Sequence, residues 1–180
     1  MEAGHEWQDA SLQELIVHIV SCHHTFLRSH LPRIEMIFDR ILAKRKDALC
    51  GFVLPLGRAF LGLRLDIEAH LDKEESILFP HIIRLAAARA KGKTPPQATF
   101  GSVTGPIRVM EAEHDSAKRA LQEMRRLTDG YSLHSGTCSN RTELFQALKE
   151  LEVDLEEHMA LENDVLHPRV LQLEAQFGDR

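Results

Sequence analysis

The chain has 180 residues, of which 27% are charged and 43% hydrophobic, and its net charge is −5 at pH 7. These values are typical of one globular domain, and the negative charge gives no basis for binding nucleic acid or an anionic membrane. No apolar run reaches the ~18–20 residues that span a bilayer, and the acidic N-terminus is unlike a secretory signal. We therefore expect a cytoplasmic protein without a membrane or nucleic-acid partner.

The predicted elements are long amphipathic helices. Residues 1–10 indicate a flexible lead-in, and a capping box formed by Ser11 and Glu14 predicts a helix start at about residue 12. Pro32 interrupts the helical periodicity of this segment, so we expect the first helix to be kinked or restarted there. A basic, glycine-containing connection follows over residues 44–53.

Three further helices are predicted, at about 55–90 with a bend near Pro80, at about 106–128 with Pro106 in the first turn, and at about 140–173. Loops rich in small or turn-forming residues separate them. No strand pattern is found. The sequence therefore predicts an all-α, up-down four-helix bundle over residues 11–175.

The cysteines are three in number and widely spaced, which does not indicate a disulfide framework or a CxxC site. We expect all of them to be reduced thiols. They are Cys22, Cys50 and Cys138.

The most informative feature is a sequence motif that occurs twice, 88 residues apart. Its copies are His70-Leu71-x-x-Glu74-x-x-Ile77-Leu78-x-Pro80 and His158-Met159-x-x-Glu162-x-x-Val165-Leu166-x-Pro168. Residues four apart share one face of a helix, so each copy offers an imidazole and a carboxylate together. One copy alone would fit a surface pair, or a buried Glu satisfied by Lys or Arg. Two copies among apolar neighbours, where an unpaired carboxylate is costly, predict a site for two metal ions.

Two further histidines extend this repeat. His24 precedes His70 by 46 residues, and His114 precedes His158 by 44. A helix about 45 Å long, with its connection, takes roughly 40–45 residues at ~1.5 Å per residue. The spacing therefore places one histidine from each of four helices at a common depth. A hydrogen-bonded core histidine is the alternative for His114.

The first helix holds four competing histidines. His24 keeps the phase of the apolar stripe, and His23, one residue off it, is the alternative ligand. His18 and His30 lie about half a turn away. The remaining histidines are expected at tails, loops or helix ends and not among the ligands: His5, His81, His134 and His167.

The predicted metal ligands are His24, His70, Glu74, His114, His158 and Glu162. Nitrogen and oxygen ligands without a thiolate suit iron, manganese or zinc. The two carboxylates come from different helices, and each could bridge two ions. Positions would remain for an oxo or hydroxo bridge and for a small exogenous ligand.

At these residues the chain resembles the hemerythrin-like (HHE cation-binding) domains, and within them the di-iron repair-of-iron-centres proteins. The resemblance covers most of residues 12–172. It is carried by Leu31-Pro32 after His24, by the stretches 70–80 and 158–168, and by Val109-Met110-Glu111-Ala112-Glu113-His114-Asp115.

The resemblance implies a non-haem di-iron centre held by the six predicted ligands, with Glu74 and Glu162 bridging and an oxo or hydroxo bridge between the irons. It implies a role in mending iron–sulfur clusters damaged by nitric oxide or peroxide, through iron donation or nitric oxide reduction. Nitric oxide or oxygen, and damaged iron–sulfur proteins, would then be the partners. Glu113 matches an acidic residue beside a ligand histidine in that family, which makes it a candidate for a proton or iron path.

Two differences separate this chain from the family pattern. Full-length repair proteins carry a small N-terminal cysteine-containing domain, whereas about ten residues precede the first predicted helix here. Asp66 stands where a Glu is expected one turn before the second ligand histidine. The sequence therefore leaves two interpretations: a repair protein with enzymatic activity, or a module that binds or senses oxygen or nitric oxide without turnover. A third interpretation is a partner-binding bundle with structural histidines.

Overall fold

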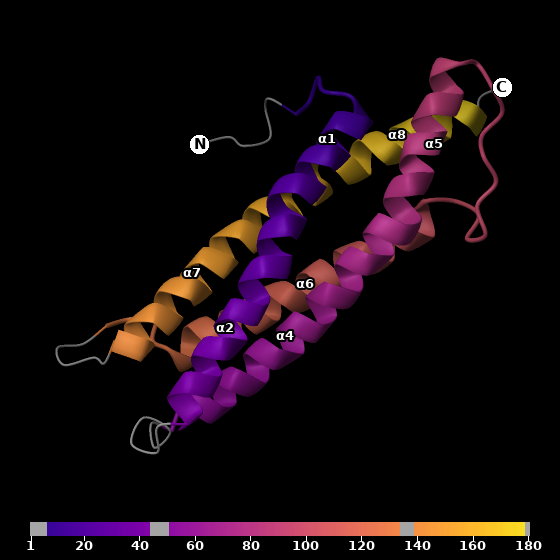
Figure 1. Ribbon diagram of the computed structural model, residues 1–180. Helices are drawn as coiled ribbons and strands as arrows, with labels where there is room; N and C mark the ends of the chain where they lie inside the picture. The colour runs from indigo at the N-terminus through magenta and orange to yellow at the C-terminus, as the bar shows by residue number, and fades with distance from the viewer. Residues whose placement is uncertain (1–6, 44–50, 134–138, 179–180) are drawn as a thin grey trace.

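The computed structural model describes residues 7–43, 51–133 and 139–178, and the regular structure in this part of the chain is entirely helical. Four helical rods run up and down along one long axis (Figure 1), which confirms the predicted four-helix bundle. The rods are α1 Leu12–Ile19, η1 Val20–His24 and α2 Thr25–Ala43; α4 Val53–Lys73, η2 Glu74–Leu78 and α5 Phe79–Ala90; α6 Thr104–Leu127; and α7 Ser139–Ala160, η3 Leu161–Leu166 and α8 His167–Gly178.

The first rod begins as predicted but does not restart at Pro32. Ser11 caps α1: its hydroxyl accepts a hydrogen bond from the backbone N–H of Glu14 at 3.2 Å. α2 runs through Pro32 to Ala43, and the interruption in regular α-helix comes earlier, at the π-helical segment η1. Leu31 and Ile34 on either side of the proline are fully buried. This packing holds the helix together across the missing backbone N–H.

The other boundaries lie close to their predicted positions. The second rod already begins at Val53, inside the segment predicted as a connection, because Val53 and Leu56 are buried in the core. The third begins at Thr104, which places Pro106 in the first turn, where its missing N–H has no helical partner to lose. Residues 44–50 and 134–138 of the predicted connections lie outside the described residues.

Three of the four rods in the described residues contain a π-helical segment, drawn within the continuous helices of Figure 1. Each segment includes one predicted ligand: His24 in η1, Glu74 in η2 and Glu162 in η3. The fourth rod, α6, carries His114 and is regular α-helix throughout. Wide π turns are rare and are frequently found at functional sites.

The apolar core consists of two clusters, one on each side of the predicted ligands along the bundle axis. Leu71 belongs to the larger cluster and Leu78 to the smaller one, and Glu74 lies between them on the same rod. The fourth rod repeats this order around Glu162. A polar layer therefore crosses the interior of the bundle between two hydrophobic cores.

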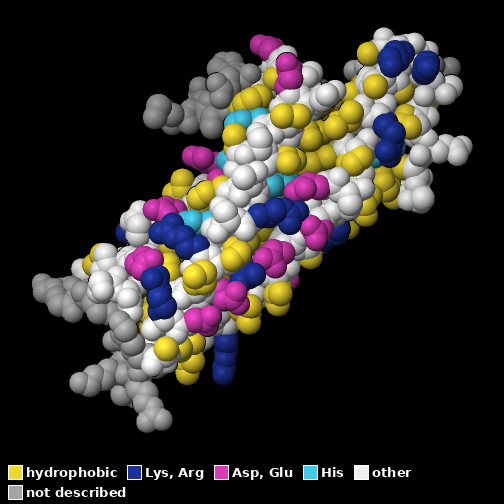
Figure 2. Space-filling model, in the orientation of Figure 1, with side chains coloured by type: hydrophobic (Ala, Val, Ile, Leu, Met, Phe, Trp, Pro, Cys, Tyr) yellow, Lys and Arg dark blue, Asp and Glu magenta, His cyan; other side chains and the backbone are white. Residues whose placement is uncertain are grey.

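The face shown in Figure 2 mixes charged side chains of both signs with apolar side chains. Within the described ranges, no helix combines the length and the apolar character needed to cross a bilayer. Part of the predicted lead-in is anchored, because Arg169 donates hydrogen bonds to the backbone carbonyls of Trp7, at 2.7 Å, and Ala10. Cys22 is a free, exposed thiol, whereas Cys50 and Cys138 fall outside the described residues.

Candidate metal centre

The six predicted ligand side chains meet at one level inside the bundle, and each is at most 1% exposed. Their nitrogen and oxygen atoms form two overlapping groups, and the ligand atoms within each group all lie within 4.8 Å of one another. The groups are His24, Glu74, His158 and Glu162, and His70, Glu74, His114 and Glu162. Both carboxylates are therefore shared, while each group has two imidazoles of its own.

Each carboxylate directs its two oxygens to different groups. The Oε2 of Glu74 lies 3.4 Å from Nε2 of His24, and its Oε1 lies 3.3 Å from Nε2 of His70. Glu162 repeats this arrangement, with its oxygens 3.1 Å from the Nε2 atoms of His158 and His114. Such an arrangement suits carboxylates that each contact two cations.

These inward-facing atoms lack the partners that buried polar atoms need. Neither oxygen of Glu74 or Glu162 has a hydrogen-bond partner among the described residues, and neither does Nε2 of His24 or His158. Leaving buried carboxylates and imidazoles unpaired is costly, so native proteins rarely do it. Cations placed within the two groups would satisfy all of these atoms, and the residues therefore fit a metal pair.

In three of the four imidazoles, the Nδ1 atom, which points away from the ligand groups, is hydrogen-bonded to a neighbouring side chain. A ring that donates from Nδ1 keeps its Nε2 lone pair free for a metal ion, which fixes both its tautomer and its orientation. The acceptors are Glu75 for His24 at 2.8 Å, Glu113 for His70 at 2.9 Å, and Asn163 for His114 at 2.9 Å.

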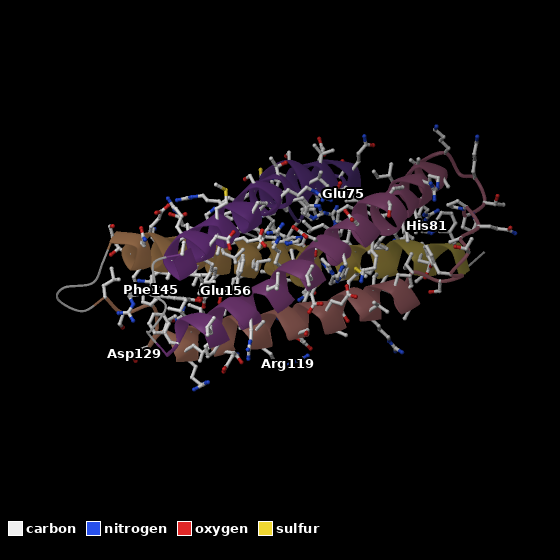
Figure 3. The ribbon with its side chains drawn as sticks, turned by 60° about the horizontal axis from the view of Figure 1, so that its bottom comes forward. Glu75, His81, Arg119, Asp129, Phe145 and Glu156 are labelled. Carbon is white, nitrogen blue, oxygen red and sulfur yellow. The ribbon has the colours of Figure 1, made fainter. Side chains whose placement is uncertain are left out.

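Two of these acceptors connect the buried imidazoles with the surface. Glu75 also accepts a hydrogen bond from Arg28 at 3.1 Å, and Glu113 accepts one from Lys73. Partial burial opposes ionisation of both carboxylates, but hydrogen bonds from the neighbouring imidazole and cation outweigh it and lower the pKa of each. Figure 3 shows Glu75 in the middle part of the bundle, between the ends marked by Phe145 and His81.

The two shared carboxylates have opposite pKa shifts. Burial, followed by the charge of Glu162, raises the pKa of Glu74 to about 8. Burial acts in the same direction on Glu162, but His158 and His114 outweigh it and hold its pKa well below the usual range. Two carboxylates buried this close together favour a shared proton or a cation between them.

The choice between His23 and His24 has a clear geometric outcome, because the structure brings only His24 into a ligand group. His23 is buried too, but its Nδ1 lies 2.9 Å from Oδ1 of Asp154, and its ring stacks at 5.7 Å on that of His158. His30, predicted off the apolar stripe, is also buried and donates from Nε2 to the carbonyl of Ala147 at 2.9 Å.

The helix-end histidines lie deeper than predicted. His81 is buried with its ring 5.0 Å from that of Phe100, and His167 is buried with its ring 6.1 Å from that of His114. Neither joins a ligand group. His167 was predicted at a helix end and not among the ligands. It is the first residue of α8, which continues directly from η3, and it lies on the buried face of this rod. His5 and His134 lie outside the described residues.

Sequence reasoning missed Glu75 and Asn163, although the repeat contained a signal for both. Each follows a shared carboxylate by one residue. Glu75 accepts a hydrogen bond from His24, and Asn163 accepts one from His114. Glu113 was identified only through a family resemblance. Its carboxylate lies 2.9 Å from Nδ1 of His70.

Comparison with known proteins gives this arrangement a family. The hemerythrin HHE cation binding domain matches residues 15–170, which includes all six converging side chains. The chain belongs to the hemerythrin HHE cation-binding family. Cation binding is the property for which this HHE domain is described, and the two overlapping groups gather buried side chains that could hold a metal ion.

Several relatives of this HHE chain are iron-sulfur cluster repair proteins named YtfE. The protein from Edwardsiella ictaluri is 34% identical over 166 residues, which is 92% of this chain and 69% of that protein. The protein from Dickeya chrysanthemi is 34% identical over 168 residues, covering 93% and 69%. A Yersinia pseudotuberculosis relative is 31% identical over 173 residues, covering 94% and 71%.

Proposed function

We propose that this protein is a non-haem di-iron protein that repairs iron–sulfur clusters during nitrosative or oxidative stress. The observation that carries this proposal is the sharing of Glu74 and Glu162 between two four-residue ligand groups. The names of the relatives support the repair role. Damaged iron–sulfur proteins would then be the macromolecular partners.

One iron would be held by His24 and His158 and the other by His70 and His114, with both shared carboxylates bridging. Imidazole nitrogens and carboxylate oxygens without thiolate suit iron, and carboxylate-bridged metal pairs are known inside four-helix bundles. We further propose an oxo or hydroxo bridge and open positions for nitric oxide or oxygen. When bound, the iron pair supplies the redox chemistry and the site for the diatomic ligand.

The protein's own residues would orient the ligands, exclude water and connect the centre with solvent. All six ligand side chains are buried between two hydrophobic cores, which keeps bulk water away from them. Glu113 contacts His70 at 2.9 Å, and its side chain is 33% exposed. It therefore reaches both the centre and the surface, and we assign to it a path for protons or for iron.

The complete burial of the ligands favours a second candidate function. A centre that lies wholly inside the bundle is suited to retaining its iron, which fits a module that binds or senses nitric oxide or oxygen without turnover. The reduced protein separates the two candidates under anaerobic conditions. Steady consumption of nitric oxide supports the enzyme, and a single stoichiometric nitrosyl complex supports the binding module.

The metal centre itself is tested by iron quantification together with a Mössbauer spectrum after anaerobic purification. We expect about two coupled iron ions per chain. Glu74→Ala and Glu162→Ala should each lose the paired-iron signal, whereas Glu143→Ala, which removes an exposed partner of Arg40, should retain it. Unchanged iron content in both bridging variants would contradict the assignment.

A further inference from the structure

The two halves of the repeat differ at the position five residues after each shared carboxylate. Phe79 follows Glu74 by five residues, and His167 follows Glu162 by the same number. Phe79 packs its ring 5.7 Å from that of His24, with 23° between the planes. His167 stacks 6.1 Å from His114, with 8° between the planes. The two residues therefore occupy matching places, each against an imidazole of a different ligand group.

Packing alone does not account for an imidazole at position 167. In the other half of the repeat a phenyl ring fills the matching place, and both residues are buried, at 2% exposed for Phe79 and 1% for His167. A buried imidazole without hydrogen bonds costs free energy that a phenyl ring would not. A histidine here therefore indicates a polar partner that the packing does not supply.

The ring nitrogens of His167 have no such partner within the part of the chain that is described. The nearest carboxylate oxygen, Oε1 of Glu111, lies 3.8 Å from Nδ1, which is too far for a hydrogen bond. The nitrogens also stay outside both ligand groups. The imidazole thus lies beside the centre with its hydrogen-bonding capacity unused.

The electrostatic surroundings of His167 belong to the centre. Its ring lies 6.1 Å from that of His114, and an imidazole carries at least one N–H donor in either protonation state. The ionisable groups that act on it are those of the candidate centre: Glu162, His114, His70 and His158.

We propose that His167 is a positioning residue that hydrogen-bonds a small polar ligand bound at the metal position of His70 and His114. At the other metal position, that of His24 and His158, the apolar ring of Phe79 occupies the place that corresponds to His167. The two metal positions are therefore unequal, and exogenous ligands bind on the His167 side. This inference rests on the proposed di-iron centre and adds to it the side of ligand entry.

The test uses azide as the probe, titrated into the oxidised, iron-loaded full chain and followed by the azide-to-iron absorption band. His167→Phe installs the residue that the other half already uses, so it should keep about two irons. Its dissociation constant for azide should rise at least ~10-fold, as expected for losing one hydrogen bond to a charged ligand. His167→Gln, which retains an N–H donor, should stay within about 3-fold of the parent protein.

His81→Phe is the matched control, because it makes the same substitution at a buried histidine that lies outside both ligand groups. It should leave azide affinity unchanged. Normal azide affinity in His167→Phe with full iron content would overturn the proposal, and so would loss of iron, which would show that His167 is needed to hold the metal rather than to position its ligand.

The parent protein provides a test that needs no variant. In the Mössbauer spectrum, azide should change the signal of one iron more than that of the other. Equal changes in both would overturn the inference while leaving the di-iron centre intact. Absence of an iron pair before azide is added would overturn the proposed function itself.

Discussion

The side-chain oxygen of Asn163 accepts a hydrogen bond from Nδ1 of His114 at a distance of 2.9 Å. Asn163→Ala removes this acceptor, and the imidazole loses its fixed tautomer and orientation. We expect metal affinity to fall ~10–100-fold, the usual effect of losing a hydrogen bond behind a ligand histidine. Competition with a chromophoric chelator measures the change. Asn163→Asp restores an acceptor and should restore binding, and equal affinity in all three proteins would contradict this role.

Glu113 offers a test of the path between the centre and solvent. Glu113→Gln keeps an oxygen to accept from His70 but loses the charge that pairs with Lys73. We expect nearly full iron content and a roughly 10-fold change in the rate of iron release to a chelator. Glu123→Gln, which removes a surface charge paired with Arg126, is the control. Identical release rates in both variants would count against a role for Glu113.

His81 should make stability depend on pH. Burial, followed by the charge of Arg84, lowers its pKa, while Glu174 acts in the opposite direction. The unfolded chain, with an ordinary histidine pKa of about 6.5, therefore binds this proton more readily than the folded chain. The free energy of unfolding should fall as pH drops from about 7.5 to about 5.5. Urea denaturation of the metal-free protein measures this in the transition of the smaller apolar cluster, beside which His81 lies, and the slope should be smaller in His81→Phe.

Two glycines should respond to alanine in opposite ways. Gly130 has φ +65° in the turn after α6, where a Cβ would meet no atom within 4 Å but the backbone conformation itself disfavours it. Gly130→Ala should destabilise the fold by about 1–2 kcal/mol. Gly62 lies inside α4 with open space around it, so Gly62→Ala should stabilise by about 1 kcal/mol. Thermal unfolding of both variants checks the sign of each effect.

The repeat predicted four of the six side chains that meet, His70, Glu74, His158 and Glu162, because residues four apart share one face of a helix. The common depth followed from the near-equal spacing of the four histidines. Both inferences depend on local geometry that any amphipathic helix shares. The capping box at Ser11 is similarly local, and the structure contains it.

The features that sequence reasoning missed depend on tertiary packing. The π-helical segments have no residue signature of their own, since a wide turn forms where packing and ligand placement favour it. α2 does not restart at Pro32, because the local cost of the proline is outweighed by the burial of Leu31 and Ile34. The burial of His167 depends on which face of the last rod packs against the other rods, and its expected place at a helix end did not reveal that packing.

The polar layer between the two hydrophobic cores has a consequence for how cooperatively the molecule unfolds. Leu71 and Leu78 belong to separate apolar clusters, and the groups between them repel or stay unpaired unless cations join them. Bound ions would then couple the unfolding of the two apolar clusters. Calorimetry should record a single transition for the loaded protein and two for the stripped protein, in which the half built on the smaller cluster melts first.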